Sequence, residues 1–318
     1  MVILKAVLLL LAGFVFLSKG ADFFVEGASS VAKMLKVPSL IIGMTIVAMG
    51  TSLPELSVSV TASMNGSNAL AVSNVIGSNI FNLMVVLGFS AVITPLLVGK
   101  DVLKKDYPFS LFCAILLLVL GFIQMELGHI DGIIFLVIFA AFLISQIISA
   151  QKARAASLEN EQADEEDSGQ LSFIFSVIYI IGGACAVKFG GDWVVSGAVS
   201  LATVYGLSEN LIGLTIVALG TSLPELVTSI AAARRNELDM AIGNVVGSNI
   251  FNILMILGVA AAISPITFVM ENVMDIGILL VFSAIVWVFC FTKGRINRRE
   301  GIIMLLLYAV YLVYICNR

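Results

Sequence analysis

The sequence predicts an all-α integral membrane protein with ten transmembrane helices, arranged as two inverted five-helix repeats with broken second and seventh helices. Composition is the first of three observations behind this fold class: 60% of the residues are hydrophobic, only 12% are charged, and the mean hydropathy is +1.09. Soluble domains carry about 25% charged residues, so most of this chain faces lipid or other helices. The second observation is an internal repeat, and the third is an odd number of apolar spans in each half.

The apolar segments divide the chain into ten spans at about 20 residues per span. The N-terminal span is expected to be retained rather than cleaved as a signal peptide, because the repeat gives it a counterpart in mid-chain. We expect a first repeat at 1–150, an acidic linker at 151–170 and a second repeat at 171–318. The predicted spans are 2–29, 39–64 (broken near Pro54), 70–96, 107–125, 130–150, 171–200, 209–234, 240–266, 274–291 and 301–315.

The repeat is centred on Gly50-Thr51-Ser52-Leu53-Pro54-Glu55, which recurs letter for letter at 220–225, 170 positions later. At that offset the halves align without a gap from Gly13 and Gly183 to Pro95 and Pro265. Because each half holds five spans, the second half enters the membrane from the opposite side. Inverted repeats with interrupted helices are an architecture of secondary transporters, whose sites lie near the bilayer midplane.

Loop charges predict the orientation, because basic residues concentrate in cytoplasmic loops. With both termini extracellular, the basic loops and the acidic linker all lie on the cytoplasmic side of a multi-pass protein of the plasma membrane. The basic residues of these loops are Lys33, Lys36, Lys100, Lys104, Lys105, Lys152, Arg154, Arg234, Arg235, Lys293, Arg295, Arg298 and Arg299.

The first candidate site is the repeated motif itself. Spacings of three and four residues share a helix face, so Thr51 and Ser52 are expected beside Glu55. Pro54 cannot donate a backbone hydrogen bond and disrupts the preceding turn, which is expected to free carbonyls such as that of Ala48. A carboxylate inside a membrane costs about 2.5 kcal/mol or more, and the chain carries two in this setting. The second copy supplies Ala218, Thr221, Ser222 and Glu225.

The second candidate site is the asparagine segment at 74–82, mirrored at 244–252. Spacing by four residues puts the asparagines and serine of each copy on one helix face, and Gly77 and Gly247 are expected to allow close helix approach. Packing with interhelical amide hydrogen bonds is the alternative, and it stays open for Asn74 and Asn244. The positions expected to coordinate an ion are Ser78, Asn82, Ser248 and Asn252.

The ligand types indicate a hard cation. Carboxylate, hydroxyl, amide and carbonyl oxygens suit Ca²⁺ and Na⁺, whereas imidazole and thiolate suit transition metals. Two carboxylates match one Ca²⁺ in charge, and Na⁺ can use the same oxygens. Competition at a shared site with alternating access gives antiport.

The duplicated Gly-Thr-Ser-Leu-Pro-Glu, with the Gly-Ser-Asn-Ile segments at 77–80 and 247–250, resembles the alpha repeats of sodium/calcium exchangers of prokaryotic type, in the cation/calcium exchanger superfamily. The resemblance covers nearly the whole chain. It implies a five-plus-five inverted fold that exchanges Na⁺ for Ca²⁺, with the first and sixth helices sliding past a core. It also implies Glu55 and Glu225 as principal Ca²⁺ ligands, with Ala48, Ala218 and the neighbouring hydroxyls contacting the ions.

Other readings of the sequence stay open. H⁺/Ca²⁺ exchange is one, because a buried carboxyl group can take up a proton, and K⁺-dependent Na⁺/Ca²⁺ exchange is another. Asn252 stands where some relatives carry Asp, which argues against K⁺ dependence. An ion channel is a further class, whereas an intramembrane enzyme lacks its motifs. We expect no cofactor beyond the transported Ca²⁺ and Na⁺, the lipid bilayer as surroundings, no nucleic-acid partner, and a functional monomer.

Overall fold

The computed structural model describes residues 2–64, 68–159, 171–206 and 218–317. Within these ranges the chain is helical apart from turns and four two-residue strands. Eight of the described helices are long and apolar enough to cross a membrane, and a ninth span is obtained if one bent pair of helices counts as a single span. The predicted span at 209–234 begins outside the described residues, so the ten spans stay a prediction.

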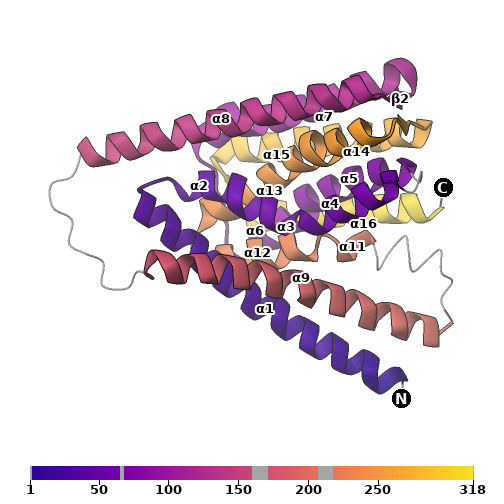
Figure 1. Ribbon diagram of the computed structural model, residues 1–318, viewed down its shortest axis with the longest axis horizontal. Coiled ribbons are helices and arrows are strands. Elements are labelled where there is room, and N and C mark those ends of the chain that lie inside the picture. The colour runs from indigo at the N-terminus through magenta and orange to yellow at the C-terminus, as the bar shows by residue number, and fades with distance from the viewer. Residues whose placement is uncertain (1, 65–67, 160–170, 207–217, 318) are drawn as a thin grey trace.

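Helices α1 (Val2–Leu35) and α9 (Phe173–Val204) form a pair along one side of the molecule (Figure 1). Their backbones approach so closely that a Cβ atom on Gly20 would lie 3.0 Å from the Gly183 carbonyl oxygen, and one on Gly183 would lie 2.6 Å from the Phe24 nitrogen. Gly13 and Gly190 face each other in the same way. Glycines at these crossings let two apolar helices pack backbone to backbone, as small residues do in membrane helix pairs.

The segment predicted to break near Pro54 does so at Ser52. It consists of α2 (Ser39–Ile42), the π-helical turn η1 (Gly43–Val47), α3 (Ala48–Thr51) and α4 (Leu53–Met64). The axis bends by 49° between Thr51 and Leu53. The described part of its counterpart is α11 (Ala218–Gly220) and α12 (Leu223–Arg234), with Ser222 between them.

Two further segments form the centre of the bundle: α5 (Asn68–Phe81), η2 (Asn82–Val86) and α6 (Leu87–Ile93), and α13 (Leu238–Phe251), η5 (Asn252–Ile256) and α14 (Leu257–Ile263). The apolar window of each is 78% buried, against 17–39% for the other six spans. Both change to a π-helical turn at an asparagine of the repeated segment. Such turns are frequent at functional sites.

The outer helices are α7 (Tyr107–Gln124), preceded by η3 (Val102–Asp106), then α8 (His129–Glu159), α15 (Met270–Lys293) and α16 (Arg298–Asn317). Two small antiparallel sheets join the halves: β1 (Leu96–Leu97) with β4 (Arg295–Ile296), and β2 (Glu126–Leu127) with β3 (Ile266–Thr267). The linker was predicted to start at 151, but α8 continues to Glu159. The acidic residues of the predicted linker begin only at Glu159, so residues 151–158 can continue the helix.

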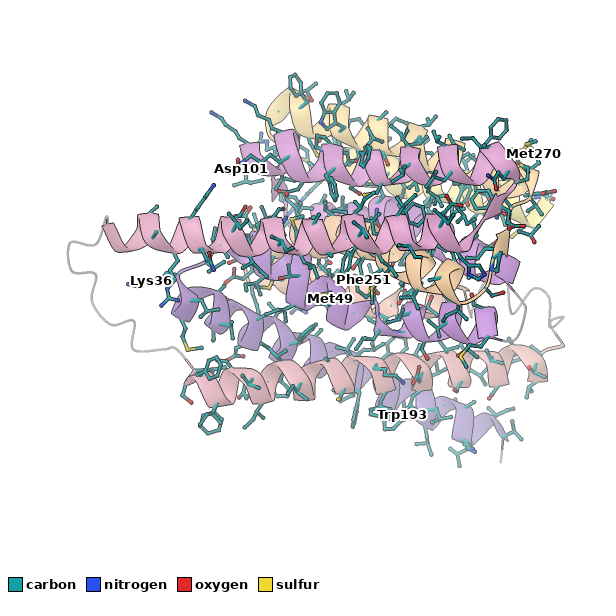
Figure 2. All side chains as sticks on the ribbon, turned by 45° about the horizontal axis from the view of Figure 1, so that its top comes forward. Lys36, Met49, Asp101, Trp193, Phe251 and Met270 are labelled. Carbon is teal, nitrogen blue, oxygen red and sulfur yellow. The ribbon has the colours of Figure 1, made fainter. Side chains whose placement is uncertain are left out.

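The two ends of the molecule are distinct. In Figure 1 both chain termini lie at one end of the long axis, and the ends of α8 and α9 that flank the linker lie at the opposite end. Residues 39–64 and 218–234 run in opposite directions along this axis (Figure 1). In Figure 2, Lys36 and Asp101 lie toward the linker end, whereas Met49, next to Gly50, and Phe251, in the second asparagine segment, lie in the middle. Both candidate segments thus include a residue midway along the molecule.

Candidate functional site

The two repeated motifs meet across the bundle, and each serine contacts the carboxylate of the other copy. The Ser52 hydroxyl donates to Glu225 Oε1 at 2.7 Å, and the Ser222 hydroxyl donates to Glu55 Oε1 at 3.2 Å. All four side chains are fully buried. The helical spacing had predicted each hydroxyl beside the carboxylate of its own copy. At the bend, the Ser52 hydroxyl bonds the glutamate of the other motif.

The serines of the asparagine segments complete the same cluster. Ser248 lies with its hydroxyl oxygen 3.1 Å from that of Ser52, and Ser78 lies 3.1 Å from Ser222. Both contacts join residues of opposite halves. The structure therefore brings together six predicted site residues in two reciprocal groups: Ser52, Glu225 and Ser248, and Ser222, Glu55 and Ser78.

Each carboxylate keeps one oxygen without a partner. Among the described residues, Glu55 Oε2 and Glu225 Oε2 are buried and accept no hydrogen bond, and the same holds for the side-chain oxygens of Asn82 and Asn252. Buried polar groups are normally satisfied, and an uncompensated buried carboxylate is costly. A bound cation would give these four buried oxygens the partner that they lack.

Asn82 and Asn252 reach this region from the two π-helical turns. Turn η5, which begins at Asn252, packs against α4 of Glu55, and η2, which begins at Asn82, packs against α12 of Glu225. Each asparagine thus lies next to the glutamate helix of the opposite repeat. Both side chains are fully buried.

Ala48 and the threonines are placed less symmetrically. Pro54 was expected to leave the Ala48 carbonyl without a hydrogen bond. This carbonyl instead accepts the Ser52 N–H at 3.1 Å and the Thr51 hydroxyl at 3.3 Å. Pro54 removes only its own donor, so the hydrogen bond one turn earlier survives. Thr51 is buried, whereas Thr221 is half-buried and lines a pocket of about 330 Å³. Ala218 begins α11, and its side chain lies outside the described residues.

Asn74 and Asn244 both make interhelical hydrogen bonds of the kind that the packing alternative predicted. Asn74 Nδ2 donates to Ser59 at 3.2 Å, and Asn244 Nδ2 donates to Ser229 at 2.9 Å. Gly247 packs as expected, since a Cβ there would lie 2.5 Å from the Met44 carbonyl oxygen. At Gly77 no described atom lies within 4 Å of that position, so the matching close approach is absent from the described residues.

The sequence analysis missed Asn79 and Asn249, which follow the two site serines. Each side-chain nitrogen donates to the backbone carbonyl of the other residue at 3.3 Å, which ties the two central helices together. The signal was available, because both lie inside the duplicated Gly-Ser-Asn-Ile segments. Neither residue shares the helix face of the serine and asparagines that are spaced by four in its segment, so helical spacing did not indicate it.

Among the described residues, no group of three or more His, Cys, Asp or Glu side chains is placed to hold a metal ion. The interior cluster instead offers two carboxylates with neutral oxygens around them, a chemistry suited to hard cations. A buried cluster of this kind at mid-depth between interrupted membrane helices defines a class of protein, the membrane transporters of small cations.

The chain belongs to the sodium/calcium exchanger protein family, whose family model matches residues 5–148 and 175–317. The resemblance noted from the repeated motifs is thereby confirmed, and so is the expectation of a membrane antiporter rather than an enzyme. The two matched stretches lie on either side of the linker.

Named relatives cover almost the whole chain. It is 36% identical over 315 residues to the putative antiporter CaxA of Alkalimonas amylolytica, across 97% of this chain and 98% of that protein. It is 32% identical over 339 residues to the sodium/calcium exchanger MaX1 of Methanosarcina acetivorans, across 96% and 97%. A solved structure of the sodium-calcium exchanger NCX_Mj, soaked with Na⁺ and Sr²⁺, superposes with a TM-score of 0.85 at 34% identity, across 98% and 99%.

Proposed function

We propose that this chain is a secondary active antiporter that exchanges Na⁺ for Ca²⁺ by alternating access at one shared site near the bilayer midplane. The observation that carries the proposal is the reciprocal pair of serine–glutamate contacts, which leaves Glu55 Oε2 and Glu225 Oε2 buried and unpartnered. Family membership supports the same function. Two carboxylates balance one Ca²⁺, and Na⁺ ions bound to the same oxygens compete with it.

The cation ligands in this proposal are the twelve residues singled out from the sequence. Glu55 and Glu225 supply the charge, and hydroxyl, amide and backbone oxygens complete a coordination shell of six to eight, as Ca²⁺ prefers. The neutral contributors are Ala48, Thr51, Ser52, Ser78, Asn82, Ala218, Thr221, Ser222, Ser248 and Asn252.

The moving part in this proposal is the α1–α9 pair. Phe24 of α1 packs on Gly50, where a Cβ would lie 2.8 Å from the ring, and Val195 of α9 packs on Gly220, where a Cβ would lie 2.1 Å from a methyl group. One side chain of each paired helix thus covers the glycine that starts each motif. Sliding of the pair would shift both contacts, so that one motif is uncovered while the other stays covered.

The fold and orientation expected from the sequence belong to the same proposal: ten spans in two inverted repeats, and a monomer in the plasma membrane with its termini outside. The opposite chain directions of 39–64 and 218–234 support the inversion (Figure 1). The position of Lys36 at the linker end, opposite the termini, supports a cytoplasmic linker (Figure 2).

Ion flux into liposomes tests the function directly. Purified protein in Na⁺-loaded vesicles is diluted into Na⁺-free buffer with labelled Ca²⁺, and uptake that requires the outward Na⁺ gradient is expected. Uptake driven by a pH gradient without Na⁺ would assign proton coupling, and uptake that needs added K⁺ would assign the K⁺-dependent alternative. Ca²⁺ flux independent of every counter-gradient would overturn antiport and indicate a channel.

A further inference from the structure

The amide contacts around Asn79 and Asn249 break the symmetry of the site. Their mutual bonds to backbone carbonyls are matched at 3.3 Å. Asn252, however, donates its Nδ2 to Asn79 Oδ1 at 3.0 Å. The equivalent contact in the other half would join Asn82 to Asn249. This contact is not made: among the described residues, both polar side-chain atoms of Asn82 and the Oδ1 of Asn249 have no hydrogen-bond partner.

An asparagine side chain has a donor end and an acceptor end, so fixing one end fixes the direction of the other. Asn252 commits its donor to Asn79, and its Oδ1 stays buried without a hydrogen bond. Only the oxygen end can bind a cation. Asn252 is therefore held by its Nδ2 with its Oδ1 available to a cation, whereas neither Nδ2 nor Oδ1 of Asn82 is held.

We propose that Asn79 is a positioning residue for the cation site, which holds the amide of Asn252 so that Asn252 Oδ1 is preset for the ion. Asn249 performs no such task for Asn82, so the two halves of the site differ in how well their amide ligand is organised. This inference rests on the proposed function only in taking the bound species to be Ca²⁺ or Na⁺. A ligand oriented in advance binds better because binding no longer has to order it.

The chain supplies its own matched control. Asn79→Ala and Asn249→Ala each remove one side-chain bond to a backbone carbonyl of the same length, but only Asn79→Ala releases the Asn252 amide. Losing a partner that orients a metal ligand typically weakens metal binding by 10–100-fold. We expect Asn79→Ala to weaken Ca²⁺ binding by about ten-fold and Asn249→Ala to weaken it less than about two-fold. Asn79→Ala is also expected to lower the unfolding temperature more, because it removes the contact with Asn252 as well.

The experiment measures Ca²⁺ binding to purified protein by titration calorimetry, together with thermal unfolding and the Ca²⁺ and Na⁺ concentrations for half-maximal transport. Asn79→Ala in an Asn252→Ala background is expected to cause no further loss of binding. Equal losses in Asn79→Ala and Asn249→Ala, or an undiminished loss without Asn252, would overturn the positioning role. Wild-type Ca²⁺ binding without Na⁺-driven transport would count against the proposed function alone.

A second comparison covers the case in which Asn79→Ala does not fold. If Asn252 is oriented in advance and Asn82 is not, Asn252→Ala removes a preset ligand and Asn82→Ala removes one that must first be ordered. The Asn252 variant is therefore expected to lose several-fold more Ca²⁺ affinity. Equal losses at the two positions contradict the proposal.

Discussion

Glu55 and Glu225 each satisfy one carboxylate oxygen with a serine from the opposite repeat and leave the other oxygen unpartnered. Hydroxyl donors compensate little of the several kcal/mol that a buried ion costs. The two buried carboxylates also repel each other. A bound cation relieves both problems at once, which is why these residues are expected to be decisive for transport.

Replacing either glutamate by glutamine tests that expectation. Glu55→Gln or Glu225→Gln keeps the shape of the side chain but halves the formal charge of the site. We expect Na⁺-driven Ca²⁺ uptake to fall by about a hundred-fold, at the upper end of what loss of a metal ligand's support produces, while the protein still folds. The measurement is labelled Ca²⁺ uptake in liposomes with size-exclusion chromatography as the check on folding.

Glu126→Gln is the matched control, because Glu126 is an exposed acid in the short strand β2. It should leave uptake unchanged. Full retention of Ca²⁺ transport in either site variant would contradict the proposal that both carboxylates bind the ion.

Aspartate at the two amide positions separates charge from hydrogen bonding. Asn252→Asp adds a third negative charge and also places a carboxylate against Asn79 Oδ1, where Asn252 now donates at 3.0 Å. Asn82→Asp adds the same charge without losing a hydrogen bond. We expect both to change the preference among Na⁺, K⁺ and Ca²⁺, and Asn252→Asp to lose about 1–3 kcal/mol more stability than Asn82→Asp, because only Asn252 loses a hydrogen bond.

Competition of Na⁺ and K⁺ with labelled Ca²⁺, together with denaturation in detergent, measures the two effects separately. Unchanged ion preference in Asn252→Asp argues against Asn252 lining the site. Equal destabilisation of the two variants argues against the contact with Asn79.

At the scale of elements, the contact between α1 and α9 depends on glycines that face the opposite backbone. Gly183 is buried, and a Cβ on it would lie 2.6 Å from the Phe24 nitrogen. Gly182 is the adjacent residue of the same helix and is exposed, with nothing within 4 Å of that position among the described residues. The two glycines therefore share a helix but not an environment.

Alanine at the two positions distinguishes packing from helix propensity. Gly183→Ala forces the helices apart, and such overpacking costs about 1–3 kcal/mol. Gly182→Ala is expected to be neutral or to stabilise by about 0.5–1 kcal/mol through the lower backbone entropy of alanine. Thermal unfolding and transport rate are measured for both, and equal behaviour of the pair contradicts the close packing of α1 on α9.

The sequence predicted those elements whose causes are local. Proline inside an apolar run located the bend to within two residues, and the duplicated motif predicted the residues that meet in the candidate site. The partner of Ser52 could not be predicted, because helical spacing describes one helix and Glu225 lies 173 positions away. The end of α8 was missed for a related reason, since its last turns are polar and lie beyond the apolar run that defined the span.

At the scale of the whole molecule, two pockets of similar size lie at different places along α1 and α9. One, of about 330 Å³, is lined by Ser57, Asp192 and Thr221. The other, of about 320 Å³, is lined by Glu26, Lys33 and Arg235, near the end of α1 that leads to α2. Since α1 ends and α9 begins at the linker end (Figure 1), the second pocket opens at that end. The first lies beyond the middle of α9, toward the chain termini.

Cysteine labelling from either side of the membrane tests this sidedness. In a background with the exposed Cys185 and Cys316 replaced by serine, Ser57→Cys and Lys33→Cys are treated with a membrane-impermeant thiol reagent in right-side-out and inverted vesicles. Ser57→Cys should react only from the side of the termini, and Lys33→Cys only from the side of the linker.

Because the half-buried Thr221 lines the first pocket and the buried Thr51 does not, Thr221→Cys should also react from the termini side, while Thr51→Cys stays protected. Labelling of Ser57→Cys and Lys33→Cys from the same side contradicts the placement of the pockets, and reaction of Thr51→Cys and Thr221→Cys at equal rates contradicts a site open to one end only.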